Sequence, residues 1–549
     1  MLAGAAARAL GGETPVAALS RAAWFPPIIA SLAAAFLAAG IARRFGWRTG
    51  LLAGAGVALS LYHLDKSRLG AIDHHFLEFP LVLGILLAVT GVRRATDARS
   101  ALRYGGLLGV AISVALFVQP ALVFAAGIAL LAVLLLGHDE RMPRLAACVG
   151  FALASGLLFV YRSVQPAGYP DNEWYLGTPH AALLLGAAAA CAAQLWILEK
   201  GASLPNAFLS AIAIGLLVIA AVPSAIQALT GGSQFFGGDP WLRSISEFQP
   251  LFFHVEGSGW LFDIGDLGGG GLLAIPILFR RNWWKGSRRI LLVFAIVYLS
   301  AAISSMRFLA VAAPLLAVSG AVFYSDLRNA GFERLAGAAA GLLIAPGLVL
   351  SLARVIQPSP VIGPEVLPMV RAAQTVAGET SRHGGVLCGW SWGHLFNVIA
   401  DRRVLVDNFG SWSDPVEFGN STAAILTTRE RFAADYCRDH GVRFVVLENP
   451  LPYFAARAES AGLPRSACEW PVGSGEPTRL MRSTFWWRAY LEGGRARPDL
   501  GPAGAAFADF RLVRVETEPG SRKKHTAVEI WEVLPRGRLV VGGAHAHRP

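Results

Sequence analysis

The sequence predicts a polytopic α-helical membrane protein with about twelve spans, followed by a soluble α/β domain. Its 549 residues are 54% hydrophobic and only 15% charged, which is more apolar than a soluble core of this length requires. Apolar runs near the roughly 20 residues that cross a bilayer recur over residues 1–356. The composition of residues 357–535 is that of an ordinary α/β domain, and we expect residues 536–549 to form a disordered tail.

Length and apolarity place the individual spans along the membrane domain. They are expected near 24–42, 48–64, 76–92, 104–118, 120–137, 143–162, 180–198, 207–227, 267–280, 288–304, 307–325 and 335–356.

Basic residues give the orientation, because they follow every second expected span. They are Arg43, Arg44, Arg48, Arg93, Arg94, Arg99, Arg103, Arg141, Arg144, Lys200, Arg280, Arg281, Lys285, Arg288, Arg289, Arg328 and Arg334. By the positive-inside rule these loops are cytoplasmic. The loops 65–75, 163–179 and 228–266 and the soluble domain then face outward from a cell membrane. Much of the net charge of +11 lies in the cytoplasmic loops, so it requires no nucleic-acid partner.

The unusual polar residues fall on the outward face. Asp73, His74 and His75 are of the types that bind divalent metals, and Asp73 and His75 could turn toward one ion from a loop. Charges that snorkel at a helix end are the alternative interpretation. Glu247, in the segment Ser-Ile-Ser-Glu, reads by itself as a solvated loop acid. Arg307 begins an apolar span, where a planar guanidinium either anchors the helix or binds phosphate.

An aromatic segment, GWSWG at 389–393, opens the soluble domain. Aromatic side chains at a turn belong either to a core or to a peptide-binding cleft. The segments RDHGVRFVVLENP and FADFRLVRVE further on are typical of a helix leading into a strand and of a strand.

Taken in order, these motifs resemble the catalytic subunit of oligosaccharyltransferases, especially the single-subunit kind of archaea and bacteria. Asp73 and His75 match an Asp-x-His form of one acidic motif, and Glu247 matches the glutamate of the outer-loop motif. GWSWG stands in the place of the family's Trp-Trp-Asp-Tyr-Gly motif. The similarity covers residues 15–535.

The resemblance implies a fold and an activity. The fold is that of the GT-C glycosyltransferases, which are inverting enzymes. The reaction is transfer of a glycan from a polyprenyl (pyro)phosphate carrier to the asparagine of an Asn-x-Ser/Thr acceptor protein, at the surface of the lipid bilayer.

It also implies roles for individual residues. Mg²⁺ or Mn²⁺ would be held by Asp73, His75 and Glu247, of which Asp73 and Glu247 would be catalytic together with Arg307. Arg307 and Lys66 would bind the lipid phosphate. Trp390, Ser391 and Trp392 would bind the acceptor.

Two departures from the family pattern bear on these expectations. The family's first span and the acidic motif that follows it have no counterpart, so we expect the natural start to lie upstream of Met1. Ser391 replaces the motif's aspartate and Gly389 its first tryptophan. Acceptor recognition is therefore expected to be altered.

Two other functions stay open at this stage. One is a GT-C transferase that uses a polyprenyl-monophosphate sugar with a lipid or another protein as acceptor, which the altered GWSWG motif favours. The other is a catalytically degenerate membrane paralogue, which the absent acidic motif favours. Against a transporter, the polar residues gather at one face rather than near the midplane of the bilayer.

Overall fold

The structure of the protein is a computed structural model. It describes residues 23–60, 63, 66–67, 75–167, 171, 175–233, 250–251, 267, 270–271, 273–274, 276–356, 366–379, 384–406, 415–450, 454, 457–458, 478–496, 499–500, 505–517 and 528–536. The chain divides into two compact units, Met1–Gln357 and Pro358–Pro549.

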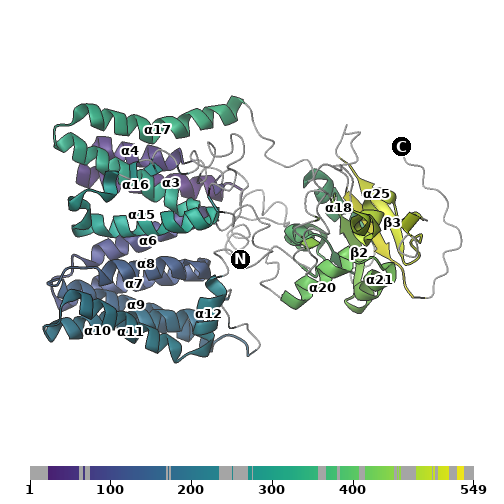
Figure 1. Ribbon diagram of the computed structural model, residues 1–549, viewed down its shortest axis with the longest axis horizontal. Helices are drawn as coiled ribbons and strands as arrows, with labels where there is room; N and C mark the ends of the chain where they lie inside the picture. The colour runs from purple at the N-terminus through teal and green to yellow at the C-terminus, as the bar shows by residue number, and fades with distance from the viewer. Residues whose placement is uncertain are drawn as a thin grey trace. The chain divides into compact units, whose positions relative to one another are not determined.

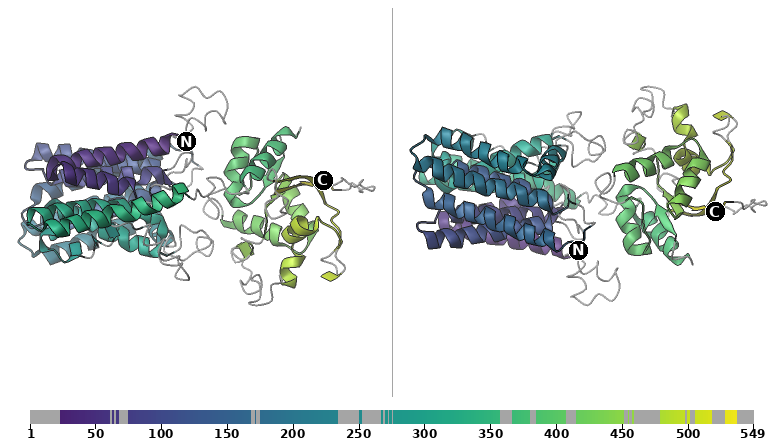
Figure 2. Two further views of the ribbon diagram at one scale, coloured as in Figure 1. Left: turned by 90° about the horizontal axis from the view of Figure 1, so that it is seen from above. Right: turned by 90° about the horizontal axis from the view of Figure 1, so that it is seen from below.

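The first unit is a bundle of helices that lie side by side (Figure 1). Its helices are α3 (Phe25–Phe45), α4 (Trp47–Ala58), α6 (His75–Val92), α7 (Ala98–Val118), α8 (Val123–Leu134), α9 (Arg141–Ser163), α10 (Thr178–Glu199), α11 (Leu204–Ala220), α12 (Pro223–Ser233), α15 (Gly286–Ser304), α16 (Leu309–Asn329) and α17 (Glu333–Ile356). Among the described residues, short turns of 3₁₀ helix lie between these helices: η1 (Pro120–Leu122), η4 (Arg281–Trp284) and η5 (Met306–Phe308). Both further views show the same bundle (Figure 2).

Eight helices among the described residues are long and apolar enough to cross a membrane. The pair α11 and α12 makes a ninth span if it is counted as one, although it is bent by 110°. The bend falls just before Pro223, whose ring and missing N–H interrupt a helix. The polytopic membrane class agrees with this, whereas the count of about twelve spans stays a prediction.

Small residues let the helices approach closely in the middle of the bundle. A Cβ added to Gly105 of α7 would lie 2.4 Å from the Ala146 carbonyl oxygen of α9. Such small-residue contacts are a common way to pack helices where lipid, not water, is the solvent. At its start, α7 carries a capping box in which the Asp97 side chain accepts from the Ser100 backbone N–H. Of the described spans, α16 is the most enclosed, with 94% of its apolar window buried.

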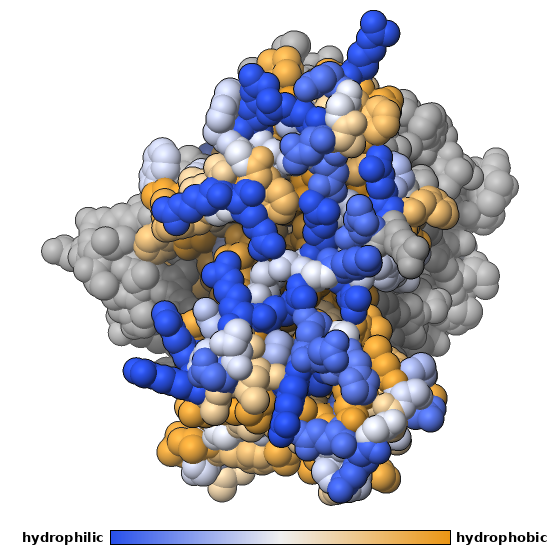
Figure 3. Space-filling model, turned by 90° about the vertical axis from the view of Figure 1, so that its left-hand side faces the viewer, coloured by the Kyte–Doolittle hydropathy of each residue, from blue (hydrophilic) through white to orange (hydrophobic). Residues whose placement is uncertain are grey.

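The turns that carry the predicted cytoplasmic arginines gather at one end of this bundle. Contacts join them to one another: Arg93 to Glu140, Arg141 to Glu199, Arg288 to Asp326, and Arg289 to the Leu135 carbonyl. Figure 3 shows a band of hydrophilic residues across this end. The shared end fits the positive-inside pattern, but which side of the membrane it faces stays a prediction.

The second unit is an α/β domain, as the sequence predicts. Its elements are α18 (Val366–Gly378), β1 (Gly385–Leu387), η6 (Trp390–Trp392), α19 (Gly393–Leu395), the π-helical turn η7 (Phe396–Ala400), α20 (Pro415–Leu426), α21 (Glu430–Asp439), β2 (Val442–Leu447), α24 (Arg479–Ser483), α25 (Phe485–Glu492), β3 (Phe510–Glu516) and β4 (Val528–Val533). The sheet has the order β1-β2-β4-β3, in which β1 and β2 are parallel and the other two pairs antiparallel.

Helices cover both faces of this sheet because its central strand is apolar on both sides. Phe444 and Val446 of β2 pack with α18 and η7. Val445 and Leu447 point to the opposite face, where they pack with α21 and α25. The sheet thus holds the loop after β1, which carries the GWSWG segment, next to the end of β2.

Candidate active site

The first turn of α6 brings His75 and an acid that the sequence did not single out, Glu78, together. His75 begins the helix and Glu78 lies one turn on, so both side chains face the same side. The His75 Nδ1 lies 3.0 Å from the Glu78 Oε1, and both side chains are almost completely buried. A carboxylate at this position also interacts favourably with the positive end of the helix dipole.

Arg307 joins this pair from a distant part of the sequence. It lies in the turn η5 between α15 and α16, and its Nη2 is 3.6 Å from the same Glu78 Oε1. Its side chain is 10% exposed, so the arginine is inserted among protein groups rather than spread on the surface. Glu78 therefore bridges a predicted metal ligand and the predicted phosphate-binding cation.

Aromatic side chains and a loop contact fix the turn that presents Arg307. Phe308 packs 5.2 Å from Phe124, and Phe124 packs edge-on against Tyr298 at 5.4 Å between ring centroids. The Leu251 N–H donates to the Ile303 carbonyl at 3.1 Å. This bond attaches Leu251, a residue within the predicted 228–266 loop, to the end of α15 that leads into Arg307.

The other predicted residues of this site are not all described. Asp73 and Glu247 lie outside the described residues, so their part in the site stays a prediction. Within the residues that the structure describes, no group of three or more His, Cys, Asp or Glu side chains could hold a metal ion. Lys66 is half-buried, and its contact with a lipid phosphate also stays a prediction.

The GWSWG segment directs its side chains in different directions. It follows β1 and forms the turn η6, in which Ser391 is exposed. Trp392 turns back into the fold, where its Nε1 donates to the Glu448 carboxylate at the end of β2. Trp390 instead lines a small pocket. Of the three predicted acceptor-binding residues, Trp390 borders this pocket, and the acceptor-binding role of all three stays a prediction.

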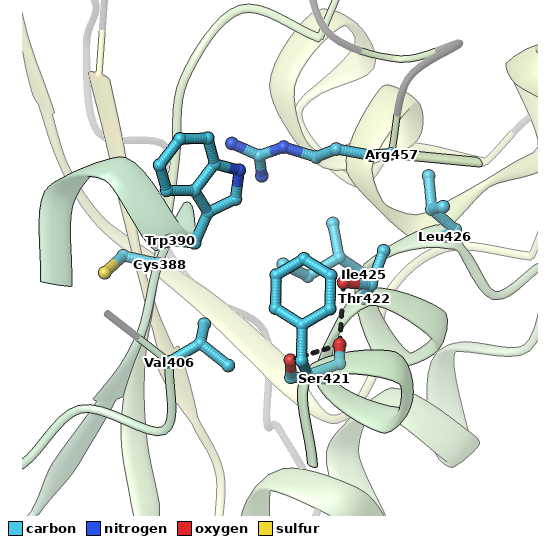
Figure 4. A pocket seen from close by; sticks show the side chains of 9 residues that line it. Cys388, Trp390, Val406, Ser421, Thr422, Ile425, Leu426 and Arg457 are labelled. Atoms are coloured by element: carbon cyan, nitrogen blue, oxygen red, sulfur yellow. Dashed lines mark hydrogen bonds between the residues drawn. The ribbon is translucent and has the colours of Figure 1, made fainter. Parts of the chain in front are cut away.

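The pocket beside Trp390 has room for about one water-sized group (Figure 4). Arg457 points toward the Trp390 indole on one side, and α20 supplies Ser421 and Thr422 on the other. Both hydroxyls donate to the Phe418 carbonyl, at 2.9 and 2.8 Å. The pocket thus has an apolar lining with polar groups at its margin, and its size suits one methyl or hydroxyl group of a side chain.

Two acids of these sites, Glu78 and Glu448, are not among the residues predicted from the sequence. The spacing of three between His75 and Glu78 is a signal that could have identified Glu78, because it places both side chains on one helical face. Glu448 follows a strand, and nothing in the local sequence indicates that it contacts Trp392, which is 56 positions away.

These features define a polytopic membrane protein whose helical bundle carries a buried His–Glu–Arg cluster, joined to an α/β domain with a small aromatic pocket. No family model matches the sequence, and no curated protein matches it.

Solved structures do match, among them archaeal oligosaccharyltransferases. AglB from Archaeoglobus fulgidus, in complex with an inhibitory peptide and a dolichol-phosphate, superposes with a TM-score of 0.71 at 19% identity, covering 92% of this chain and 69% of that one. The A. fulgidus enzyme tethered to an acceptor peptide with the NVT sequon gives 0.65 at 19%, with 92% and 68% covered. Its complex with Zn and sulfate gives 0.63 at 20%, with 91% and 67% covered. The resemblance found in the sequence is thereby confirmed at the level of the fold.

Proposed function

We propose that this protein is a membrane-bound oligosaccharyltransferase, which moves a glycan from a polyprenyl (pyro)phosphate to an asparagine side chain. The observation that carries the proposal is the His75–Glu78–Arg307 cluster, formed by two distant segments in a chain that has the AglB fold over 92% of its length. Structures of this fold were solved with a dolichol-phosphate and with a peptide that contains the NVT sequon, which supports a lipid-linked donor and a peptide acceptor. The alternatives, a transferase with a lipid or other protein acceptor and a degenerate paralogue, are less favoured by the sequon peptide.

His75 is the predicted metal ligand that the structure describes, and its contacts are compatible with a divalent metal ion. Glu78 engages the Nδ1 of His75, so the Nε2 is the ring nitrogen that would face a metal, as in many carboxylate–histidine–metal arrangements. One imidazole with the carboxylates of Asp73 and Glu247 forms a set that suits Mn²⁺ or, with more water ligands, Mg²⁺. When bound, such an ion supplies positive charge for the leaving pyrophosphate.

Arg307 supplies the second positive charge of the proposed site. In the reaction the asparagine nitrogen bonds to the sugar C1, the C1–O bond to phosphate breaks, and the leaving pyrophosphate takes the electron pair. A guanidinium can donate two parallel hydrogen bonds to the oxygens that gain this charge. Lys66 is proposed to contact the same phosphate. Glu247 is proposed to orient the acceptor amide. The proton that the amide nitrogen loses as it bonds to C1 is taken up by the leaving pyrophosphate, which gains negative charge in the same step.

The Trp390 pocket is proposed to receive the acceptor residue two positions after the asparagine. Its size suits the hydroxyl or the methyl group at the end of a serine or threonine side chain, and its lining combines apolar groups with hydroxyls. This placement rests on the implied role of the GWSWG segment.

A transfer assay tests the proposal. The full chain in lipid nanodiscs is incubated with a polyprenyl-pyrophosphate oligosaccharide, Mn²⁺ and a fluorescent Asn-x-Thr peptide, and the glycopeptide is resolved by its mobility. We expect product with this peptide and none with a Gln-x-Thr peptide or with the Glu247→Gln variant. Equal product from wild type and Glu247→Gln, or no product from wild type, would refute the proposed function.

A further inference from the structure

A buried carboxylate outside the GWSWG segment holds that segment in place. The Glu448 side chain is 8% exposed, and both of its oxygens are engaged. The Oε2 accepts from the Trp392 Nε1, and the Oε1 accepts from the Arg457 Nη2 at 2.6 Å. Because a buried charge is costly unless it is paired, these two partners are what keep the carboxylate there.

The partners of Glu448 are themselves fixed by aromatic packing. The guanidinium of Arg457 lies 4.7 Å from the ring centroid of Trp486, a cation–π geometry. The Trp486 Nε1 donates at 2.8 Å to the main-chain carbonyl of Glu448 itself. Glu448, Arg457 and Trp486 therefore form a closed set of contacts.

Gly389 makes room for this set. A Cβ at position 389 would lie 2.4 Å from the Arg457 Nη2 and 2.8 Å from the Glu448 Oε1, and real Cβ atoms do not come so close. The Trp-Trp-Asp-Tyr-Gly motif of the resembling family has a tryptophan where this chain has Gly389. In this chain, the space that a side chain at position 389 would need is filled by the Glu448–Arg457 pair.

The Glu448–Arg457 pair is connected to the candidate acceptor site by two contacts. Arg457 borders the Trp390 pocket directly (Figure 4), and Glu448 holds Trp392, two residues from Trp390 in the same turn. Ser391, between the two tryptophans, is exposed and uncharged at neutral pH. The acid nearest to the turn among these contacts is thus Glu448, and its oxygens are committed to Trp392 and Arg457.

We infer that Glu448 is a positioning residue for acceptor recognition: through Trp392 and Arg457 it sets the width of the Trp390 pocket that receives the acceptor side chain. The inference rests on the proposed function for the identity of the acceptor, a peptide with serine or threonine after the asparagine. Glu448 does not touch the peptide, and it acts only through the two side chains that it holds.

Loss of the Glu448 charge is therefore expected to weaken binding of the acceptor peptide without changing the rate of the chemical step. Loss of the negative charge leaves Arg457 without its counter-ion and loosens the Trp392 indole, so the pocket widens. Weaker peptide binding follows, while the membrane unit, which holds the donor-binding residues, is unchanged. We expect the Glu448→Gln variant to bind the peptide about tenfold more weakly.

The experiment measures peptide binding and glycan transfer separately on the full chain in nanodiscs. Fluorescence anisotropy of a labelled Asn-x-Thr peptide gives Kd, and the transfer assay gives KM for the peptide and kcat. The matched control is Glu532→Gln, because Glu532 is also a mostly buried carboxylate of this sheet and is held by two arginines, Arg443 and Arg511. We expect Glu448→Gln to raise Kd and KM about tenfold with kcat within twofold of wild type, and the control to leave all three unchanged.

The outcome that supports the inference differs from the outcomes that overturn it. Restored peptide affinity in the Glu448→Gln/Arg457→Met double variant, which removes the stranded cation, supports the inference. A Kd equal to wild type in Glu448→Gln overturns it, as does an equal rise in Kd for the Glu532→Gln control. Wild-type protein that binds the peptide but transfers no glycan would refute the proposed enzyme and leave the binding result to decide this inference.

Discussion

The imidazole of His75 and the carboxylate of Glu78 are joined at 3.0 Å across one turn of α6, and the same carboxylate oxygen lies 3.6 Å from Arg307. Glu78 therefore has two roles in the proposed site: it orients the imidazole and it offsets the arginine's charge. A carboxylate that bonds to a metal-binding histidine fixes the tautomer and raises the basicity of the ring. The relationship makes Glu78 as consequential as the residues that would touch the donor.

Replacement of Glu78 by glutamine is expected to weaken metal binding. An amide cannot hold the imidazole as a carboxylate does, and losses of about 10- to 100-fold in metal affinity are typical for such partners. The measurement is the Mn²⁺ concentration that gives half-maximal transfer, with direct Mn²⁺ binding followed by electron paramagnetic resonance. The matched control is Glu140→Gln, which removes a carboxylate bonded to Arg93 at the other end of the bundle. An unchanged Mn²⁺ affinity in Glu78→Gln would contradict the role assigned to it.

Replacement of Arg307 by lysine is expected to lower kcat/KM for the lipid-linked donor by about 100-fold. Lysine keeps the charge but lacks the planar fork that matches two phosphate oxygens. Arg288→Lys is the control, because Arg288 pairs with Asp326 at 2.6 Å away from the proposed site. The two variants are compared at saturating peptide. Equal activity of Arg307→Lys and wild type would mean that Arg307 serves only to anchor its helix.

Much of the membrane unit follows from hydropathy because each span is a local property of the sequence. The expected spans 76–92 and 143–162 correspond closely to α6 (His75–Val92) and α9 (Arg141–Ser163). Hydropathy does not detect a bend, so it predicts one span at 207–227 where the structure has two helices at 110°. Pro223 at the break is a local signal of the bend, but a count of apolar residues does not use it.

The candidate sites depend on contacts that no local pattern encodes. His75 and Arg307 could be singled out from residue type and place, but their common partner Glu78 emerges only when α6 and the turn before α16 come together. The role of Trp392 was less predictable still. Its segment indicated peptide binding, yet the indole contacts Glu448 from the end of another strand. Sequence identifies which residues are unusual, and packing decides which of them meet.

The predicted outward orientation of the candidate active site can be checked by labelling. A cysteine introduced at Ser233, the last residue of α12, is expected to react with a membrane-impermeant maleimide added to intact cells. A cysteine at Ala202, in the turn between α10 and α11, is expected to react only after permeabilisation. Wild-type cells give the background from the native cysteines. The reverse pattern would show that the basic turns face outward.

Glu430 gives the α/β domain a stability that depends on pH. Burial raises the pKa of this carboxyl above its ordinary value of 4.5, although its Oε1 accepts from the backbone N–H groups of Ala508 and Asp509. A raised pKa in the folded state means that the ionised form is penalised by folding. The penalty is absent below the unfolded pKa and complete above the folded pKa.

The Glu430→Gln variant removes that penalty and keeps an oxygen for the two N–H groups. Its melting temperature is therefore expected to exceed that of wild type at pH 8, and the difference is expected to shrink toward pH 4. Thermal unfolding of the full chain followed by tryptophan fluorescence measures both. A variant that is less stable than wild type at pH 8 would show that ionised Glu430 stabilises the domain.

The Gly389→Ala variant tests whether the space beside the GWSWG turn is as restricted as the structure indicates. In Gly389→Ala, the new methyl group must displace the Arg457 guanidinium or the Glu448 carboxylate, because it would lie 2.4 and 2.8 Å from them. Overpacking of this kind costs about 1–3 kcal/mol, and here it also separates an ion pair that holds Trp392. We expect a lower melting temperature together with a higher KM for the acceptor peptide.

The matched control is Gly419→Ala in α20, where nothing lies within 4 Å of the new Cβ and alanine favours the helix by up to about 1 kcal/mol. If Gly389→Ala behaves like this control in both stability and peptide KM, Arg457 and Glu448 can move aside freely, and the pocket wall at Arg457 is not rigid enough to select an acceptor.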